Sequence, residues 1–266
     1  SAACYLLALE EREKTGQDFR AVFADTGNEH ELTVEYISSL AEKTGGPKIE
    51  TVKADFAPKI AARRIKLEIM LESGEFTDGW DEEKVRRVLE HLHSTGVPFL
   101  DMCLWKGRFP STKARFCTGE LKLEAIKRGA TEPAICEAIA AGGNAGDVVN
   151  WVGIRRDESK ARANAMTWET ENNGSQIYRP LVEWSKAACF DLLYRHGLDV
   201  NPLYRLGCGR VGCMPCIMAR KAEIREIARR QAAGVGKGRE PLLEMWDKHI
   251  LLGGYRTGER GQQIAH

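Results

Sequence analysis

The sequence predicts an α/β fold, a Rossmann-like parallel sheet with flanking helices, followed by a cysteine-bearing C-terminal portion. Two observations predict it. Over the first 75 residues, segments with helical apolar periodicity alternate with short apolar runs, a pattern that favours a parallel sheet covered by helices. Near the other end, three of the eight cysteines fall within nine positions, in "GCGRVGCMPC".

The individual elements follow from apolar spacing, and several of the helices end at glycine. The apolar run "FRAVFADTG" leads into a polar loop, as a buried strand does. Residues 97–123 are predicted to be irregular and basic. In chain order, we expect helices over 1–13, 31–46, 57–74, 81–96, 132–143, 184–197 and 222–234, and strands over 19–27, 49–55 and 147–159.

A chain of 266 residues, of which 43% are hydrophobic, can bury a sizeable core. No repeat, low-complexity segment or convincing linker is evident in the sequence. We therefore expect an α/β domain over residues 1–164. A C-terminal portion over residues 165–266 would carry the cysteine cluster and further helices.

Charge and hydropathy bound the classes of function. The 39 basic and 38 acidic residues leave a net charge of +1, so binding to nucleic acid or membrane would need a local basic patch. No apolar run approaches the ~18 residues of a membrane span. No signal peptide is visible, although the chain begins with Ser1 and not with Met. Cysteines in such a chain are expected to stay reduced, and we expect a cytoplasmic protein with no membrane partner.

The C-x4-C-x2-C spacing of Cys208, Cys213 and Cys216 predicts a metal site. Neighbouring glycines let the backbone bend so that the sulfurs can converge. Cys117 is the best candidate for a fourth ligand, because its basic loop would favour the thiolate. Ligation by thiolates alone fits an iron–sulfur cluster or a structural zinc ion, and the spacing does not determine the number of irons. The alternative is three unligated cysteines in a tight loop.

The remaining cysteines show no ligand spacing. Cys4, Cys136 and Cys189 lie in apolar helical stretches and are expected in the core. Cys103 has no assigned role.

A polar loop follows the first predicted strand, in "VFADTGNEHELT". In open α/β sheets, ligands bind beyond the carboxyl ends of the strands. Asp25 or Glu29 could contact a ribose, an amine or Mg²⁺, and Thr26, Gly27 and Asn28 could offer backbone N–H groups. The alternative is a strand–helix turn in which Asn28 or Glu29 caps the following helix.

Residues 153–162, "GIRRDESKAR", also follow a predicted strand and are rich in arginine. Guanidinium groups bind phosphate or sulfate through two parallel hydrogen bonds, and a helix N-terminus adds its dipole. The alternative is an exposed helix start with ion pairs such as Glu158–Arg162. The position after a strand favours an anion site, whose candidate residues are Arg155, Arg156, Glu158, Ser159, Lys160 and Arg162.

A further basic segment, "RFPSTKARFCTGELK", surrounds Cys117. Its cationic side chains, Lys113, Arg115 and Lys122 together with Arg108, could hold an anionic substrate near a metal centre. The alternative is a solvated surface loop.

These segments together resemble one known family. "SAACYLLALE" is similar to the helix that follows a pyrophosphate-binding loop of the form SGGKDSA. Ser1 would be the last serine of that loop, whose glycines, lysine and aspartate are not in this chain. "FADTGNEHELT", "RFCTGELK", "GIRRDES" and "RVGCMPCI" follow in the order found in the phosphoadenosine phosphosulfate (PAPS) reductase family, nearest its phage-type and DndC-like branch. The resemblance covers roughly residues 1–225, and several short motifs in the right order make it specific.

The resemblance implies an adenine nucleotide alpha-hydrolase-like fold that binds ATP or PAPS at the carboxyl ends of the strands, with Mg²⁺ as a further candidate. It implies that Ser1 contacts phosphate, that residues 25–29 line the nucleotide pocket and that residues 155–162 face phosphate or sulfate. It also implies a 4Fe-4S cluster, with zinc as the alternative. The implied ligands are Cys117, Cys208, Cys213 and Cys216.

The sequence departs from the family pattern in two places. Assimilatory adenylylsulfate reductases carry a Cys-Cys pair where this chain has Phe116 and Cys117, so Cys208 would supply the missing ligand. Those reductases also use a nucleophilic cysteine in a C-terminal tail, whereas no cysteine follows Cys216 here. A chain that is complete in this form would not make the usual enzyme-bound thiosulfonate.

We therefore expect an enzyme of sulfur metabolism. The first hypothesis is sulfur transfer of the ATP-pyrophosphatase type, with DNA phosphorothioation or another nucleic-acid thiolation as examples. The second is reduction of PAPS or adenylylsulfate to sulfite. A nucleotide-binding module with a structural metal is the non-catalytic alternative, and a zinc-ribbon nucleic-acid binder is a weaker one. Expected partners are an adenine nucleotide, a sulfur-donor or electron-donor protein and, for thiolation, DNA or RNA; the oligomeric state stays open.

Overall fold

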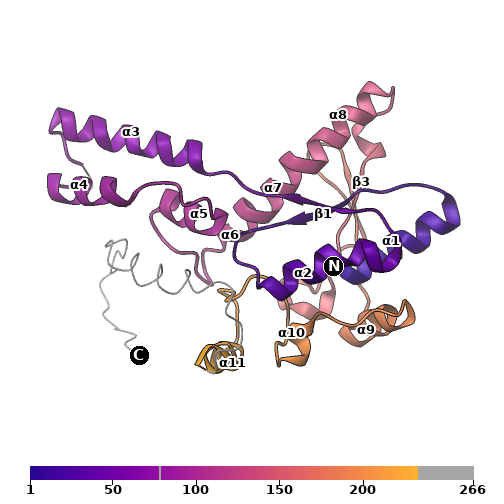
Figure 1. Cartoon of the computed structure of the whole chain (residues 1–266). Helices are drawn as coiled ribbons and strands as arrows, with labels where there is room; N and C mark the ends of the chain where they lie inside the picture. Colours follow the sequence, from indigo (N-terminus) through magenta and orange to yellow (C-terminus); the bar gives the residue numbers. More distant parts are fainter. Residues whose placement is uncertain (78, 233–266) are drawn as a thin grey trace.

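The computed structural model describes residues 1–77 and 79–232, and their helices surround short strands (Figure 1). The first elements are α1 (Ala2–Thr15), β1 (Ala21–Ala24), α2 (Glu31–Thr44), β2 (Ile49–Val52) and α3 (Ala57–Ser73). They confirm the predicted alternation of helix and strand. β1 and β2 pair in parallel, with Ala21 opposite Ile49 and Ala24 opposite Val52. The carboxyl ends of both strands therefore lie at the same edge.

Helices α3 and α4 (Glu82–His91) pack against each other and project away from the strands (Figure 1). The side chain of Asp81 caps α4 by accepting a hydrogen bond from the backbone N–H of Lys84 at 2.8 Å. The next helix, α5 (Pro98–Lys106), lies in the segment that was predicted to be irregular. Proline at the first helical position favours a helix start, which explains why a helix forms here.

A continuous helical segment covers residues 116–140 and includes two π-helical stretches, so the prediction of irregular structure up to residue 123 was wrong. Leu121 and Ala125 are buried, and this packing outweighs the low helix propensity of two glycines and a proline. A Cβ atom added at Gly129 would lie 2.7 Å from Cγ1 of Val52, so glycine lets the segment pass close to β2. The parts are α6 (Phe116–Thr118), η1 (Gly119–Leu123), α7 (Glu124–Ile126), η2 (Lys127–Thr131) and α8 (Glu132–Ala140).

A second sheet has the order β3–β5–β4, with β3 and β5 parallel and β4 antiparallel to β5. Its strands are β3 (Val149–Trp151), β4 (Trp168–Thr170) and β5 (Gln176–Tyr178), and the 3-10 turn η3 (Ala145–Asp147) precedes β3. β3 is shorter than predicted, and β4 and β5 were not predicted. The sheet joins residues on both sides of the boundary expected near residue 165. The α/β class with parallel strands and flanking helices is confirmed, although the strands of the described residues form two sheets.

The C-terminal helices are α9 (Lys186–Arg195), α10 (Pro202–Arg205) and α11 (Lys221–Ala232). α9 confirms the helix predicted over 184–197 and packs against α1. α11 confirms the helix predicted from residue 222, whose last two residues lie outside the described range. None of the helices in the described ranges is both long enough and apolar enough to span a bilayer.

Two buried clusters form the core. The first lies between α1 and α9 and includes Leu6 and Leu192, whereas the second lies among α3, α4 and α5. Cys4 and Cys189 belong to the first cluster, as predicted. Cys136 is exposed on α8, so its assignment to the core was wrong.

Gly27 provides a test of how the loop after β1 packs on α5. Its φ is +73°, and an added Cβ would lie 2.8 Å from Cγ1 of Val97 and 2.9 Å from Cδ of Pro98. We expect Gly27→Ala to lower the free energy of unfolding by about 2–4 kcal/mol, because left-handed strain adds to overpacking. Urea denaturation would measure the loss.

The matched control is Gly74→Ala, because Gly74 has a φ of +67° and no atom within 4 Å of the added Cβ. It should lose about 1 kcal/mol from backbone strain alone. Equal losses in the two variants would contradict the packing argument for Gly27.

Candidate functional site

The loop of residues 25–29, here called the strand-end loop, leaves the carboxyl end of β1 and is deeply buried. Asp25, Thr26, Asn28 and Glu29 are each 7% exposed or less. The backbone N–H of Asp25 donates to the carbonyl of Val52 at 2.9 Å, which extends the pairing of β1 with β2 by one residue. The sequence placed these residues at a strand end, and the structure confirms that position.

Asp25 carries a buried negative charge that is compensated locally. Its Oδ2 lies 2.8 Å from Nζ of Lys53, and its Oδ1 accepts the backbone N–H of Gly27 at 2.8 Å. Burial by itself raises the pKa of Asp25, but these two partners, together with Glu29, outweigh it and hold the pKa below the usual range. The carboxylate is therefore ionised near neutral pH and can accept hydrogen bonds or bind a cation.

Glu29 is held by Thr26 within the same loop. The backbone N–H and the hydroxyl of Thr26 donate to the Glu29 carboxylate at 3.0 and 2.8 Å. The thiol of Cys213 donates to Oε1 of Glu29 at 3.6 Å. Glu29 therefore joins the strand-end loop to the cysteine-bearing segment and does not cap α2, whose N-cap is His30.

The segment of residues 207–217, here called the cysteine loop, packs on the strand-end loop. Glu29 and Cys213 form an antiparallel β-bridge, and the backbone N–H of Met214 donates to the carbonyl of Asn28 at 2.6 Å. The amide of Asn28 donates to the carbonyl of Pro215 at 3.2 Å. Its other amide atom, Oδ1, is buried without a hydrogen-bond partner among the described residues, so a polar group of a ligand could meet it.

The predicted metal ligands come from two segments that lie close together. Burial raises the pKa of the Cys117 thiol, and the neighbouring thiol of Cys216 raises it further. The expectation that the basic loop favours a Cys117 thiolate is therefore wrong for the metal-free chain. Cys103, which had no assigned role, is buried close to Cys117, and burial raises its pKa well above the usual range.

The other two predicted ligands lie at different places on the cysteine loop. Burial raises the pKa of the Cys213 thiol, whereas the positive charge of Lys122, which lies in η1, lowers it. Cys208 is buried. All four predicted ligands are cysteines outside any disulfide, so the donor set fits a thiolate-bound metal in kind. In residues 1–77 and 79–232, however, no three cysteine, histidine or acidic side chains are gathered closely enough to hold a metal ion.

The residues after β3 include two arginines with different surroundings. Nε of Arg155 lies 3.0 Å from Asp157, and its Nη1 lies 3.6 Å from Glu158. Arg156 instead pairs with Glu183 and donates from Nη2 to the carbonyl of Ala165 at 2.8 Å. The Arg156 side chain thus stabilises the segment after β3 through these contacts, whereas Arg155 lies among the charged residues of the predicted anion site.

Four arginines from three segments form what we call the arginine cluster, Arg115, Arg155, Arg162 and Arg210. Burial lowers the pKa of Arg162, and the positive charges of Arg210, Arg155 and Arg115 lower it further. Arg162 also pairs with Glu158. Arg155 precedes the 3-10 turn η4 (Arg156–Glu158), and Arg162 is the last residue of the 3-10 turn η5 (Lys160–Arg162). Ser159, between the two turns, is exposed. The structure therefore brings Arg115 of the basic loop to the arginines that follow β3.

The remaining predicted residues are distributed around this site. Lys113 is exposed, and the side chain of Lys122 interacts with Cys213. A Cβ added at Gly153 would lie 2.4 Å from Cβ of Ser1, so the chain leaving β3 passes directly against the start of α1. Ser1 is thereby close to the segment that carries Arg155.

Sequence reasoning missed Lys53 and Arg210. Lys53 directly follows β2, and the rule that parallel strands end at one edge could have identified it. Arg210 stands between the cysteines in "GCGRVGC", where no local pattern marks it as a partner of residues after β3. Its role depends on how the cysteine loop docks.

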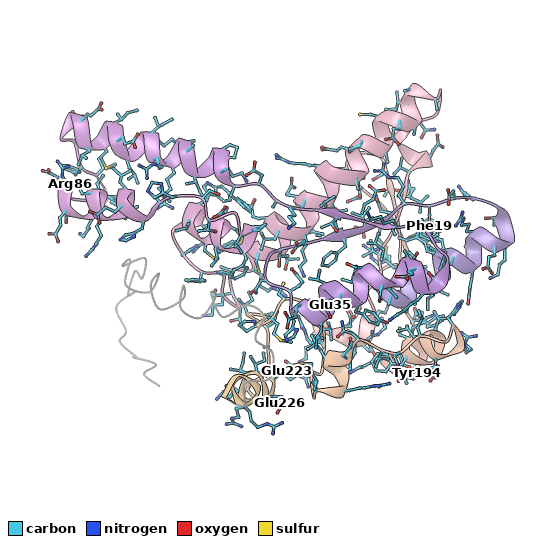
Figure 2. The ribbon with its side chains drawn as sticks, in the orientation of Figure 1. Phe19, Glu35, Arg86, Tyr194, Glu223 and Glu226 are labelled. Carbon is cyan, nitrogen blue, oxygen red and sulfur yellow. The ribbon has the colours of Figure 1, made fainter. Side chains whose placement is uncertain are left out.

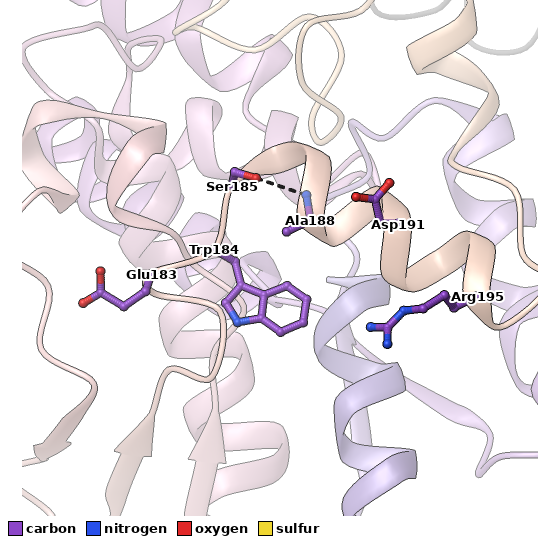
Figure 3. Close-up of a pocket in the computed structure, with 6 residues that line it drawn as sticks. All are labelled: Glu183, Trp184, Ser185, Ala188, Asp191 and Arg195. Atoms are coloured by element: carbon purple, nitrogen blue, oxygen red, sulfur yellow. Dashed lines mark hydrogen bonds between the residues drawn. The ribbon is translucent and has the colours of Figure 1, made fainter.

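An open hollow of about 510 Å³ lies at the start of α9 (Figure 3). Within it, Oγ of Ser185 accepts the backbone N–H of Ala188 at 3.1 Å. The hollow contains none of the predicted nucleotide or metal residues, so it is not the candidate site. Its lining residues are Glu183, Trp184, Ser185, Ala188, Asp191 and Arg195.

Comparisons with known proteins agree with the sequence resemblance. A family model described as "Phosphoadenosine phosphosulfate reductase domain" matches residues 1–219. The chain is 44% identical over 214 residues to an uncharacterised 37.8 kDa protein of Escherichia phage 186. This alignment covers 77% of this chain and 61% of the phage protein. It is 39% identical over 75 residues to an adenosine 5'-phosphosulfate reductase of Burkholderia cepacia, covering 27% of this chain and 30% of that enzyme.

These alignments span less than two thirds of the length of either relative. Among solved structures, a PAPS reductase from Candida auris in complex with phosphate covers 80% of this chain and 78% of its own. The sequence identity is 18% and the TM-score is 0.43.

Lys53→Met should raise the pKa of Asp25. Because the folded pKa is depressed, the ionised Asp25 stabilises the fold above its unfolded pKa of ~3.9, and this contribution is lost as the pH falls through the folded pKa. We expect a loss of about 1 kcal/mol at pH 7, limited by solvent screening at the exposed lysine, and a smaller difference in acid. Urea denaturation from pH 7 downwards and NMR titration of the Asp25 carboxyl would measure both effects.

Lys66→Met is the matched control, because Lys66 is an exposed lysine on α3 with no ion pair among the described side chains. If both variants show the same stability at pH 7 and the same Asp25 pKa, the proposed compensation by Lys53 is wrong.

Proposed function

Because the chain belongs to the phosphoadenosine phosphosulfate reductase domain family, we propose that it is an enzyme of sulfur metabolism that binds an adenine nucleotide at the strand-end loop. The phosphate or sulfate end of the nucleotide would lie on the arginine cluster. The observation that carries this proposal is that the cysteine loop interacts with both the strand-end loop and the arginine cluster. It pairs with Glu29 through Cys213 and contributes Arg210 to the cluster.

The two parts of the site suit the two ends of such a nucleotide. The ionised Asp25 can accept hydrogen bonds from ribose hydroxyls or bind Mg²⁺. Oδ1 of Asn28, which has no hydrogen-bond partner in the described part of the chain, can accept from an amine or hydroxyl. Guanidinium groups favour phosphate and sulfate oxygens because two N–H donors can bind at once. Residues 25–29 would therefore orient the nucleoside while Arg155 and Arg162 hold its anionic group.

The reaction that we favour is sulfur transfer with ATP. A target oxygen would attack the α-phosphorus of ATP and release pyrophosphate. Sulfide-level sulfur from a sulfur-donor protein would then attack the activated target atom, and AMP would leave together with that oxygen. In such a reaction the arginine cluster would stabilise the negative charge that develops on the phosphate oxygens. The acceptor would be a nucleic acid or another hydroxyl- or carbonyl-bearing molecule.

The second candidate is reduction of a sulfonucleotide, in which two electrons from a thiol donor convert the sulfate group to sulfite and release the nucleotide. The Burkholderia relative is named an adenosine 5'-phosphosulfate reductase, which favours this candidate. The same arginines would then bind the phosphosulfate. Separate assays with ATP, adenylylsulfate and PAPS distinguish the two reactions by their products, pyrophosphate or sulfite.

We also propose that Cys117, Cys208, Cys213 and Cys216 hold a metal, either a 4Fe-4S cluster or zinc. When bound, a thiolate-ligated iron cluster could take a sulfur atom as a further ligand or pass electrons. The support for this proposal is the donor set, four cysteines outside any disulfide on two neighbouring segments.

Arg155→Ala tests the nucleotide site. Arg155 lies in the arginine cluster beside Asp157 and Glu158, so its loss should weaken the affinity for ATP or PAPS by about tenfold, as expected for one charged hydrogen-bonding partner. Isothermal titration calorimetry would measure the affinity, and iron and zinc analysis should show an unchanged metal content.

Arg86→Ala is the matched control for this loss of one arginine. Arg86 lies on α4, on the arm that projects away from the strands (Figure 2). The nucleotide proposal fails if Arg155→Ala binds as tightly as Arg86→Ala.

Cys213→Ala tests the metal site. Anaerobic purification with analysis of iron, zinc and acid-labile sulfide should show about four irons and four sulfides per wild-type chain if the cluster is a 4Fe-4S cluster. Cys213→Ala should lose most of this metal, whereas Cys136→Ala, which replaces an exposed cysteine on α8, should keep it. Full metal content in Cys213→Ala would rule out the proposed ligand, and one zinc without sulfide would identify a structural zinc site.

A further inference from the structure

Arg210 connects the cysteine loop to the arginine cluster. Its Nη2 donates to Sγ of Cys216 at 3.5 Å, and its charge also acts on Arg162. Arg162 belongs to the chain that leaves β3, whereas Arg210 and Cys216 belong to the cysteine loop. The same guanidinium therefore lies between a thiol of one segment and a guanidinium of another.

The arginine cluster has more positive than negative charge. Its four guanidiniums are accompanied by two carboxylates, those of Asp157 and Glu158, which pair with Arg155 and Arg162. No carboxylate of the described residues pairs with Arg115 or Arg210. Two positive charges are thus left to repel their neighbours, and a tetrahedral dianion such as sulfate or a phosphate monoester would neutralise both.

The cysteine loop is anchored on both sides of Arg210. Before it, Nζ of Lys186 on α9 donates to the carbonyl of Gly209 at 2.9 Å. After it, the backbone N–H of Met214 donates to the carbonyl of Asn28 at 2.6 Å. These contacts hold the backbone near residue 210 while leaving its side chain between the two segments.

We propose that Arg210 is a positioning residue through which a bound sulfate or phosphate group orders the cysteine loop and places Cys216. The anion would bind between Arg155 and Arg162 on one side and Arg210 on the other. Anion binding and the order of the loop would then favour each other, because each brings the opposite charges together. This inference rests on the anion site of the proposed function but requires neither ATP nor PAPS as the ligand.

The first test is calorimetric titration of the purified full chain with inorganic sulfate and, separately, inorganic phosphate. Arg210→Gln should weaken the affinity for each anion by about tenfold, since one charged partner of the anion is lost. Arg210→Lys keeps the charge and should bind more tightly than Arg210→Gln. The matched control is Arg220→Gln, because Arg220 is an exposed arginine shortly after the same loop; it should bind like the wild-type chain.

The second test is hydrogen–deuterium exchange with and without saturating sulfate, read by peptide mass spectrometry. In the wild-type chain, sulfate should slow exchange both in residues 153–163 and in residues 205–218. In Arg210→Gln at saturating sulfate, protection should persist in residues 153–163 and be lost in residues 205–218. A merely structural role for Arg210 would change exchange in residues 205–218 equally with and without sulfate.

The inference is overturned if the wild-type chain binds neither anion, if Arg210→Gln keeps the wild-type affinity, or if sulfate protects residues 153–163 alone in the wild-type chain. These outcomes are separate from failure of the proposed function. A chain that binds sulfate through Arg210 but binds no adenine nucleotide would support this inference and contradict the proposed function.

Discussion

The site depends on the backbone pairing between the strand-end loop and the cysteine loop. Glu29 and Cys213 form a β-bridge, and Met214 and Pro215 contact Asn28 on the same side. Buried backbone groups must find partners, so each loop satisfies polar groups that the other would otherwise leave unpaired. If this contact opened, Cys213 would leave Glu29 and Arg210 would leave the arginine cluster.

The docked loops separate two kinds of electrostatic environment. At the end of β1, the buried Asp25 is kept ionised by Lys53 and a backbone N–H group. After β3, burial and the like charges of neighbouring arginines disfavour the charged form of Arg162. A bound anion would therefore stabilise the arginine cluster. The thiols of Cys117 and Cys213 are kept protonated by burial in the metal-free chain. A metal ion would reverse this preference, since only the thiolate is a good ligand.

Some of these features could be predicted because they depend on local sequence. The run "FRAVFADTG" identifies a strand and the loop that follows it, and glycines at the ends of helices mark where they stop. The α5 helix and the long segment over residues 116–140 were missed. A proline at a helix start and glycines inside a helix read locally as breaks, and their acceptance depends on packing against other elements. The exposure of Cys136 was missed for the same reason, because burial is a property of neighbours.

The sequence by itself determined the α/β class, the family and the segments that carry the chemistry, because apolar periodicity and short motifs depend on residues that are close together in the sequence. The tertiary structure decided which of those segments meet. It placed Lys53 beside Asp25, turned Arg156 toward Glu183 and brought Arg210 to the residues after β3. Interactions between residues more than forty positions apart, such as Arg162 and Arg115 or Cys213 and Glu29, depend on how whole elements pack, and no local pattern specifies them.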